Sequence, residues 1–229
     1  MNALDFSVVV DALPFLWKGL QFSLLTAVAF VAGLVLGTGL ALAQHLQVPV
    51  LAQLAKGYVA LIRSIPLIMV LFWFFFLVPL IAGWMFNNGR PMPVGGVLTA
   101  FLTFSLFEAA YYSEIIRVGL RSVGKGQYEA ADALSLSTLQ TYRHIILPQV
   151  FRVTSPIILS QTIILFQDTS LVYVLSLTDL VGAASKVALL NGRLVEMYLT
   201  VAAVYLVICT SASQLVAVLR KCTRIATNR

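Results

Sequence analysis

Residues 129–148 read EAADALSLSTLQTYRHIILP, and this stretch decides how the rest of the chain is interpreted. It is polar and rich in alanine and leucine, which favour helix. On both sides lie apolar segments long enough to cross a lipid bilayer. A polar helix between two such segments needs a reason to be there, and docking to a partner outside the bilayer is the strongest one.

The polar helix is predicted over about 127–140. Glu129 and Asp132 are expected in its first turn, where negative charge suits the helix dipole. Gly124 and Gly126 are expected to end the preceding helix.

Composition predicts an all-α integral membrane protein. Hydrophobic residues make up 60% of the 229 residues and charged residues 10%, with a mean hydropathy of +0.94. A soluble domain carries about 25% charged residues, so this chain cannot cover a water-facing surface. We expect a single membrane domain over 1–229 with about five spans, at roughly 16–43, 55–80, 95–120, 149–175 and 194–219.

Local signals refine these segments. Pro148 is expected to mark the start of the fourth span, because the residue before a proline avoids the helical conformation. Thr178 is expected to cap a short helix between the last two spans. Gly33 and Gly37 form a small-x3-small face, which would pack either against another span of this chain or against a partner helix.

The distribution of lysine and arginine predicts the orientation. With the N-terminus outside, eleven basic residues lie near the inner face and four near the outer face. This agrees with the positive-inside rule, so the 121–148 connection and the C-terminus are expected in the cytoplasm. The net charge of +6 is explained in this way, and no nucleic-acid-binding motif accompanies it.

The polar segment resembles the E-A-A-x3-G-x9-I-x-L-P signature of the inner-membrane permease subunits of ABC importers. Of seven defined positions six match, and the departure is Ser135, where the family usually has glycine. Glycine permits a sharp turn there, whereas serine disfavours positive φ, so we expect a different turn here. The matching residues are Glu129, Ala130, Ala131, Ile145, Leu147 and Pro148.

Other motifs extend the resemblance over nearly the whole chain. Tyr58-x4-Arg63-Ser64-Ile65-Pro66-Leu67 is similar to a motif of polar amino-acid permeases. Asp168-Thr169-Ser170-Leu171 is similar to their K-D-T-S-L motif, with Gln167 in place of lysine. Within this class the fourth span most resembles the glutamate/aspartate permeases. Glutamine or another polar amino acid is the alternative substrate.

This resemblance implies a mechanism and a set of partners. Two permease chains, either paralogues or two copies, would form the pathway, with an ATP-binding subunit dimer below and a periplasmic amino-acid-binding protein above. ATP and Mg would bind to the ATPase, and this chain would hold no cofactor, no metal and no catalytic residue. The residues implied in ATPase coupling are Glu129, Ala130, Ala131, Asp132, Leu134, Ser135, Leu136 and Pro148.

Ionisable residues within spans are functional candidates, because they are costly in lipid. Arg63 is either a gate or substrate contact or an ion-paired anchor, and Pro66 should kink its helix. Glu114 and Arg117 share a helix face and are expected to pair. Glu108 has no partner within its own turn, which leaves pairing with another span or a place in the pathway.

The fourth span carries a polar patch. Gln161 and Asp168 are seven residues apart and are expected on one helix face. Thr169 and Ser170 extend the patch, which faces either the pathway or the permease partner. Asp168 would repel an acidic substrate, so a role in capping a broken helix or orienting a cation is preferred.

Two other classes of protein fit less well. A secondary transporter predicts an internal inverted repeat, and five spans with one cytoplasmic helix do not divide in that way. A membrane enzyme needs a cluster of catalytic residues, yet His45 and His144 are far apart in sequence and no metal-spaced histidine pair is present.

Overall fold

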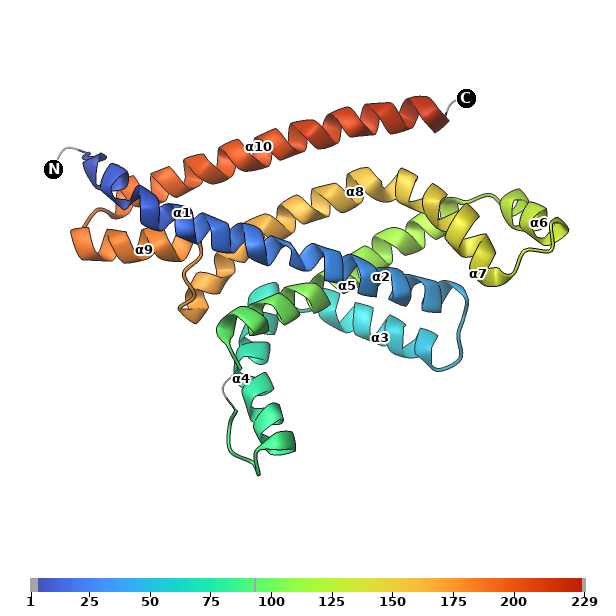
Figure 1. Cartoon of the computed structure of the whole chain (residues 1–229), viewed down its shortest axis with the longest axis horizontal. Helices are drawn as coiled ribbons and strands as arrows, with labels where there is room; N and C mark the ends of the chain where they lie inside the picture. Colours follow the sequence, from blue (N-terminus) through green and yellow to red (C-terminus); the bar gives the residue numbers. More distant parts are fainter. Residues whose placement is uncertain (1–3, 93, 228–229) are drawn as a thin grey trace. The chain divides into compact units, whose positions relative to one another are not determined.

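The computed structural model describes residues 4–92 and 94–227, with side chains up to Lys221 except Thr26. The described chain is helical (Figure 1). The elements are α1 (Ser7–Ala27), α2 (Ala29–His45), α3 (Leu51–Arg63), α4 (Leu67–Phe86), α5 (Gly96–Ser122), α6 (Lys125–Ala133), α7 (Thr138–Gln140), the π-helical η1 (Thr141–Ile146), α8 (Leu147–Asp168), the 3-10 helix η2 (Thr169–Leu175), α9 (Leu180–Asn191) and α10 (Leu194–Thr227).

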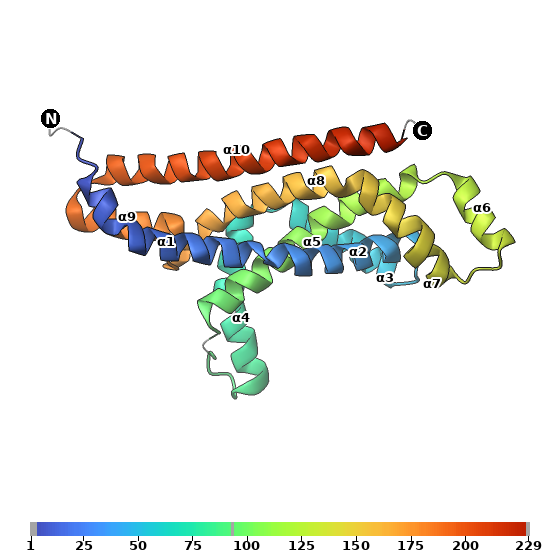
Figure 2. The ribbon, with the colours of Figure 1, turned by 45° about the horizontal axis from the view of Figure 1, so that its top comes forward.

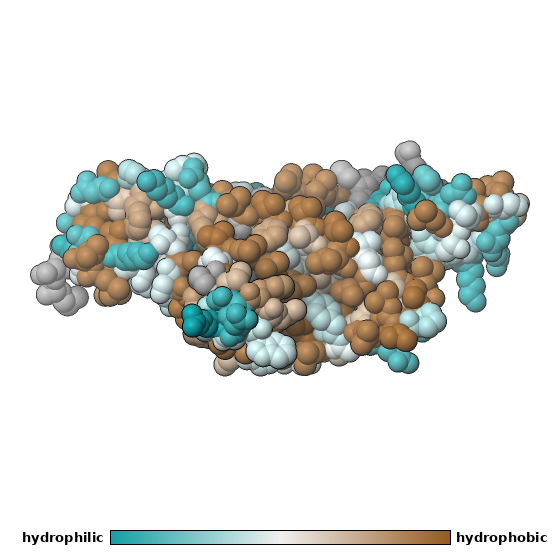
Figure 3. Space-filling view, turned by 60° about the horizontal axis from the view of Figure 1, so that its bottom comes forward, coloured by the Kyte–Doolittle hydropathy of each residue, from teal (hydrophilic) through white to brown (hydrophobic). Residues whose placement is uncertain are grey.

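Four helical stretches of the described chain are long and apolar enough to cross a membrane. They are Ser7–His45, Leu67–Phe86, Thr138–Leu175 and Leu194–Lys221. Helix α5, with 27 residues, is about 40 Å long and could also span, but it is more polar. Figure 3 shows hydrophobic side chains over much of one face, with hydrophilic residues in separate patches. The multi-span, all-α prediction is confirmed.

The first two expected spans are divided differently from the prediction. The first helix begins at Ser7 and is interrupted at Val28, so the 16–43 segment becomes α1 and α2. The second is broken at Ser64–Pro66, not merely kinked, and Pro66 becomes the residue before α4. A proline lacks the N–H that a continuous helix needs, but it is tolerated where a new helix begins.

The chain forms two compact units, which we describe separately. Unit 1 contains residues 1–30, 65–105 and 162–213. Its core joins α1 to α9 and the start of α10 through the buried residues Ala12, Leu16, Leu180, Ala183, Ala184, Ala188, Met197 and Val201. Gly19 lets α1 approach α9 closely, because a Cβ atom there would lie 2.6 Å from the Asp179 carbonyl oxygen.

Unit 2 contains residues 31–64, 106–161 and 214–229. Its core joins α2, α5, η1 and α8 through the buried residues Ala41, Ile116, Leu120, Ile146 and Val150. A Cβ atom on Gly37 would lie 2.7 Å from the Ala109 carbonyl oxygen, so α2 and α5 pack backbone to backbone. Of the two alternatives for the glycine face, packing within this chain is the one that Gly37 takes.

Candidate functional site: the connection between α5 and α8

The polar connection of unit 2 holds two short helices in place of the single one predicted over 127–140. Both views show α6 and α7 as the two arms of the connection between α5 and α8 (Figures 1 and 2). Helix α6 begins after Gly124, which has extended backbone, and Gly126 lies inside the helix. Glu129 is its fifth residue, so the prediction that Glu129 and Asp132 occupy the first turn is wrong. Gly124 alone provides the expected break.

Helix α6 ends in a left-handed turn at Ser135, whose φ is 52°. The Ser135 N–H donates to the Asp132 carbonyl at 2.9 Å, and the Leu136 N–H donates to the Ala131 carbonyl at 3.1 Å. These two bonds make a Schellman motif, which satisfies carbonyl groups at the helix end. The expectation that serine would force a different turn is therefore wrong, since the paired backbone groups hold Ser135 in a conformation that glycine prefers.

A new helix starts immediately after this turn and runs into the membrane segment. Ser137 caps α7 by a capping box, in which its backbone N–H donates to the Gln140 side chain at 2.9 Å. The chain continues without a break through η1 into α8, and Leu147 has helical dihedral angles. The prediction that Pro148 begins the span is thus wrong. A proline ring clashes with the carbonyl four residues before it in an α-helix, and the wider π turn before Pro148 relieves this clash.

Most of α6 and of the following turn is open to the surroundings of the chain. Ala131 is buried, whereas Glu129, Ala130 and Asp132 are exposed. Leu134 is 71% exposed and Leu139 is 74% exposed, although both are apolar. Leu136 is half-buried and Pro148 is exposed. Exposed leucines beside acidic and small residues form a surface suited to a protein partner.

Three ring side chains from separate segments of the sequence hold α6 against the unit. Tyr128 of α6 lies beside His45, the last residue of α2, and both lie beside Tyr142 of η1. Burial raises the pKa of the Tyr128 hydroxyl. The sequence gives only a weak signal for this contact, namely that ring side chains occur in three polar segments close to the ends of the spans.

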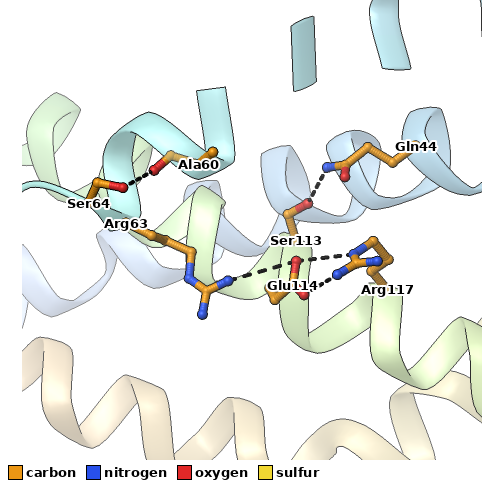
Figure 4. A network of polar contacts seen from close by, with 7 residues as sticks. All are labelled: Gln44, Ala60, Arg63, Ser64, Ser113, Glu114 and Arg117. Carbon is orange, nitrogen blue, oxygen red and sulfur yellow. Dashed lines mark hydrogen bonds and ion pairs between the residues drawn. The ribbon is translucent and has the colours of Figure 1, made fainter. Parts of the chain in front are cut away.

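A second polar group of unit 2 is centred on Glu114 (Figure 4). Glu114 pairs with Arg117 on the same helix, as predicted, and its second neighbour is Arg63 of α3 at 3.9 Å. The Arg63 guanidinium also lies 5.6 Å from the centre of the Tyr111 ring. On the preceding residue of α5, the Ser113 hydroxyl accepts a hydrogen bond from the Gln44 amide at 3.3 Å. Of the two alternatives for Arg63, the ion-paired one is present.

Glu108 is fully buried in α5, and its partner comes from another helix. The Gln161 amide of α8 donates to Glu108 Oε1 at 3.2 Å. This bond joins two predicted pathway residues, and pairing with another span is the alternative that the structure bears out. Long-range partners of this kind give no periodic signal in one sequence.

The remaining polar residues of the fourth span belong to unit 1. Asp168 is the last residue of α8, and the helix changes there to the 3-10 helix η2. Asp168 keeps helical dihedral angles and its side chain makes no capping hydrogen bond, so the helix changes its geometry here without the expected break. Thr169 is buried and donates to the Phe166 carbonyl at 2.7 Å, and Ser170 is half-buried.

The connection between α8 and α10 carries its own ordered polar residues. Asp179, not Thr178, caps α9 by accepting from the N–H groups of Val181 and Gly182 at 3.0 and 2.9 Å. Burial raises the Asp179 pKa to about 6, against the effect of these two bonds. The correction to the predicted cap is small, because both residue types are good caps and they are adjacent.

The N-terminal segment is fastened to the start of α10. Arg193 lies 3.6 Å from the Asp5 carboxylate and 3.1 Å from that of Glu196. The Asp5 N–H also donates to Glu196 at 3.2 Å. The hydrogen bond from Ser7, with a smaller contribution from Arg193, lowers the Asp5 pKa.

Within residues 4–92 and 94–227, no group of three His, Cys, Asp or Glu side chains could hold a metal ion.

Residues 29–225 match the family model described as the inner membrane component of binding-protein-dependent transport systems. This range includes the connection from α5 to α8, the last four expected spans and the first expected span from residue 29 onward. The chain belongs to this family. It is therefore an inner-membrane permease, and the resemblance found in the sequence is confirmed.

Relatives and solved structures agree with this membership. The permease is 46% identical over 224 residues to the glutamate/aspartate import permease protein GltK of Escherichia coli O157:H7, covering 96% of this chain and 99% of that one. It is 38% identical over 188 residues to the probable glutamine ABC transporter permease protein GlnP of Bacillus subtilis, covering 80% and 79%. A crystal structure of an amino acid ABC transporter with histidines superposes with a TM-score of 0.82 at 25% identity, covering 96% and 99%.

A further solved structure supports the fold alone. The inward-facing MetNI methionine ABC transporter superposes with a TM-score of 0.71 at 16% identity, covering 90% of the permease and 97% of that chain. The two superpositions extend over 96% and 90% of the permease.

Proposed function

We propose that this permease is the membrane subunit of an ATP-driven importer of glutamate and aspartate. The observation that carries the proposal is the 46% identity to GltK over 96% of the chain. Identity at this level over 96% of the chain extends beyond a shared fold. The 38% identity to a probable glutamine permease makes glutamine the second candidate substrate.

In this proposal α6 and the turn after it dock into the ATPase. The exposed residues Glu129, Ala130 and Asp132, with Leu134 at 71% exposure, offer a small, acidic and apolar surface. Glu129 lies on the exposed side of α6, where it would meet a basic residue of the partner. Closure of the ATPase dimer on ATP would move α6 and switch the access of the pathway.

The partners follow from the same proposal. A second permease chain, either a paralogue or another copy, would complete the pathway, and a periplasmic binding protein would deliver the amino acid. ATP with Mg would be bound by the ATPase dimer, and this chain would supply no catalytic group. The connection that contains α6 and the C-terminus would lie in the cytoplasm, with the N-terminus outside.

The pathway would be lined by the half-buried polar residues Gln161, Asp168 and Ser170 within the spans, and the buried Glu108 and Thr169 would hold them in place. Glu108 and Gln161 form one bonded pair, and Asp168, Thr169 and Ser170 stand where α8 changes to η2. Arg63 is 43% exposed at the side chain although it is paired with Glu114, so it remains accessible to a substrate carboxylate. Arg63 is the last residue of α3, and Pro66 lies in the break between α3 and α4.

Uptake into proteoliposomes tests this proposal. The vesicles hold the permease with its partner permease and ATPase, with binding protein and labelled amino acid outside and ATP inside. ATP-dependent uptake of both glutamate and aspartate is expected. Uptake of glutamine in their place would overturn the substrate assignment, and uptake without ATP would overturn the mechanism.

A further inference from the structure

Irregular chain segments flank α6 on both sides, and they would weaken the transfer of any motion of α6 to the spans. Residues 123–124 before the helix and 134–137 after it are outside regular helix. Such short irregular segments would absorb a displacement of α6 by changes in their backbone angles. A displacement can reach the spans efficiently only through side-chain contacts between α6 and the rest of unit 2.

Three rings provide such contacts. Tyr128 stacks on His45 with ring centres 6.4 Å apart and planes inclined by 26°. Tyr142 meets His45 edge-on at 6.0 Å and Tyr128 at 6.1 Å. All three separations lie within the range of favourable aromatic pairs, so each ring contacts the other two. We define His45, Tyr128 and Tyr142 as the ring cluster.

The ring cluster rests on the core of unit 2. Tyr128 and Tyr142 both pack against its buried residues, which include Ile116 of α5 and Ile146 of η1. Ala131, one turn after Tyr128, is fully buried. The Gln149 amide of α8 adds a hydrogen bond of 3.0 Å to Gln127, next to Tyr128. One side of α6 is thus fixed to α2 and α8, while the other side stays open.

We propose that the ring cluster is the link that transfers the motion of α6 to α2 and to the π-helical start of the fourth span. This inference rests on the proposed function of α6 as the ATPase-docking helix. Tyr128, His45 and Tyr142 would act as positioning residues, because they contact one another and the two tyrosines pack on the core of unit 2. The π turn η1 carries Tyr142, so the cluster joins α2 to a local departure from α geometry, which is frequent at functional sites.

The deciding experiment measures amino acid taken up per ATP hydrolysed in the reconstituted importer. His45→Ala leaves the sequence of α6 and the docking surface unchanged, and Tyr128→Ala removes the ring on α6 itself. Each variant should lower this ratio by about threefold to tenfold, the factor that one lost aromatic pair represents. ATP hydrolysis and copurification of the ATPase should persist. In the double variant His45→Ala/Tyr128→Ala, the fold-decrease in this ratio should be at most about twice that of either single variant. The two effects should not multiply, because both substitutions break the same cluster.

Two further variants separate a link from general stabilisation. Tyr128→Phe keeps the ring and should keep the wild-type ratio. Tyr198→Ala removes a tyrosine of α10 that is 39% exposed and lies outside the cluster, and it should also keep that ratio. If His45→Ala keeps the wild-type ratio, or if it lowers hydrolysis and uptake in parallel, the inference is overturned.

Trypsin cleavage after Lys125, the first residue of α6, gives a readout that needs no substrate. In the detergent-solubilised permease, cleavage there should be faster in His45→Ala than in wild type, because α6 loses the contact between Tyr128 and His45. Equal rates would overturn the inference even in an active importer. If the wild-type complex takes up no amino acid but the difference in cleavage rate is present, the proposed function is rejected. The role of the ring cluster in holding α6 would still stand.

Discussion

The permease contains two connections between spans that each hold a short helix, and the two helices are used in opposite ways. In unit 2, α6 has nine residues and buries only Ala131. In unit 1, α9 has twelve residues and buries five of them, namely Leu180, Gly182, Ala183, Ala184 and Ala188. The buried side of α9 is made of small residues that pack closely against α1.

The ends of the two helices differ in the same sense. Asp179 caps α9 with two side-chain hydrogen bonds, and Gly192 ends it with a left-handed φ of 66°. Gly124 precedes α6 without a side-chain cap, and Ser135 takes the left-handed position at its end. Helix α9 is therefore built as part of a core, whereas α6 buries fewer residues, has no side-chain cap and keeps an open surface.

Charge reversal should give the largest contrast between the two connections. Glu129→Lys on α6 is expected to lower ATP-dependent uptake by at least about tenfold, because a cation would face the basic residue proposed on the ATPase. The matched control is Lys186→Glu, a reversal on the exposed side of α9, which should leave uptake near the wild-type rate. Uptake and hydrolysis are measured in proteoliposomes, with membrane levels from immunoblots. Unchanged substrate-stimulated hydrolysis in Glu129→Lys would contradict the docking role.

The same enlargement of a side chain should have different effects on stability. Ala183→Leu on α9 is expected to cost about 1–3 kcal/mol, because Ala183 is fully buried and packs beside Gly19. Ala130→Leu on the exposed side of α6 should change stability by no more than about 0.5 kcal/mol. Thermal unfolding of the purified permease in detergent compares the two, and equal losses would show that α6 is packed as tightly as α9.

Removal of the cap tests the difference at the helix starts. Asp179→Ala is expected to cost about 1 kcal/mol, while Asp179→Asn keeps an acceptor for the same two N–H groups and should cost little. Gly124→Ala, at the uncapped start of α6, should have a smaller effect than Asp179→Ala. The reverse order in thermal unfolding would contradict the assignment of Asp179 as the stronger cap.

The pH dependence of stability offers a second test of Asp179. Its pKa of about 6 in the folded chain lies above the value of about 4 expected in the unfolded chain. The folded state therefore binds a proton first as the pH falls, and the wild type should gain stability relative to Asp179→Asn between about pH 7 and pH 4. A constant difference between the two over this range would show that the carboxyl group does not titrate there.

The smallest expected effect concerns Ser135, at the end of α6. Ser135→Gly should stabilise the permease by about 0.5 kcal/mol, because glycine adopts positive φ without strain but has more freedom when unfolded. Gly192→Ala at the end of α9 should destabilise the permease by about 1 kcal/mol, because alanine is strained at the positive φ that Gly192 adopts. A loss of stability in Ser135→Gly would show that the serine hydroxyl contributes more than its backbone strain costs.

Much of this arrangement could be predicted from the sequence where the signal is local. Apolar segments predicted the spans, and the spacing of Glu114 and Arg117 predicted their pair. The signature around Glu129 predicted a short polar helix, but the left-handed turn at Ser135 was not expected, because serine disfavours positive φ. The exact helix bounds were missed, because Gly126 is tolerated inside a helix near its start and the break therefore falls at Gly124 alone.

Features that depend on distant parts of the chain could not be predicted in this way. The bond between Gln161 and Glu108 joins residues 53 positions apart. Pro148 appeared to start a helix because the rule for the residue before a proline assumes α geometry, and the π turn before it changes that geometry. The ring cluster depends on three separate segments folding together.

The π-helical segment also has a consequence for how relatives of this permease are aligned. Loss of one residue from Thr141–Ile146 would turn the π turn into a regular α turn and leave the hydrogen-bond ladders on both sides intact. A one-residue gap between relatives in this region therefore belongs inside that segment, not in the irregular chain before Thr138. Placed elsewhere, the gap would pair Tyr142 with a residue on a different side of the helix.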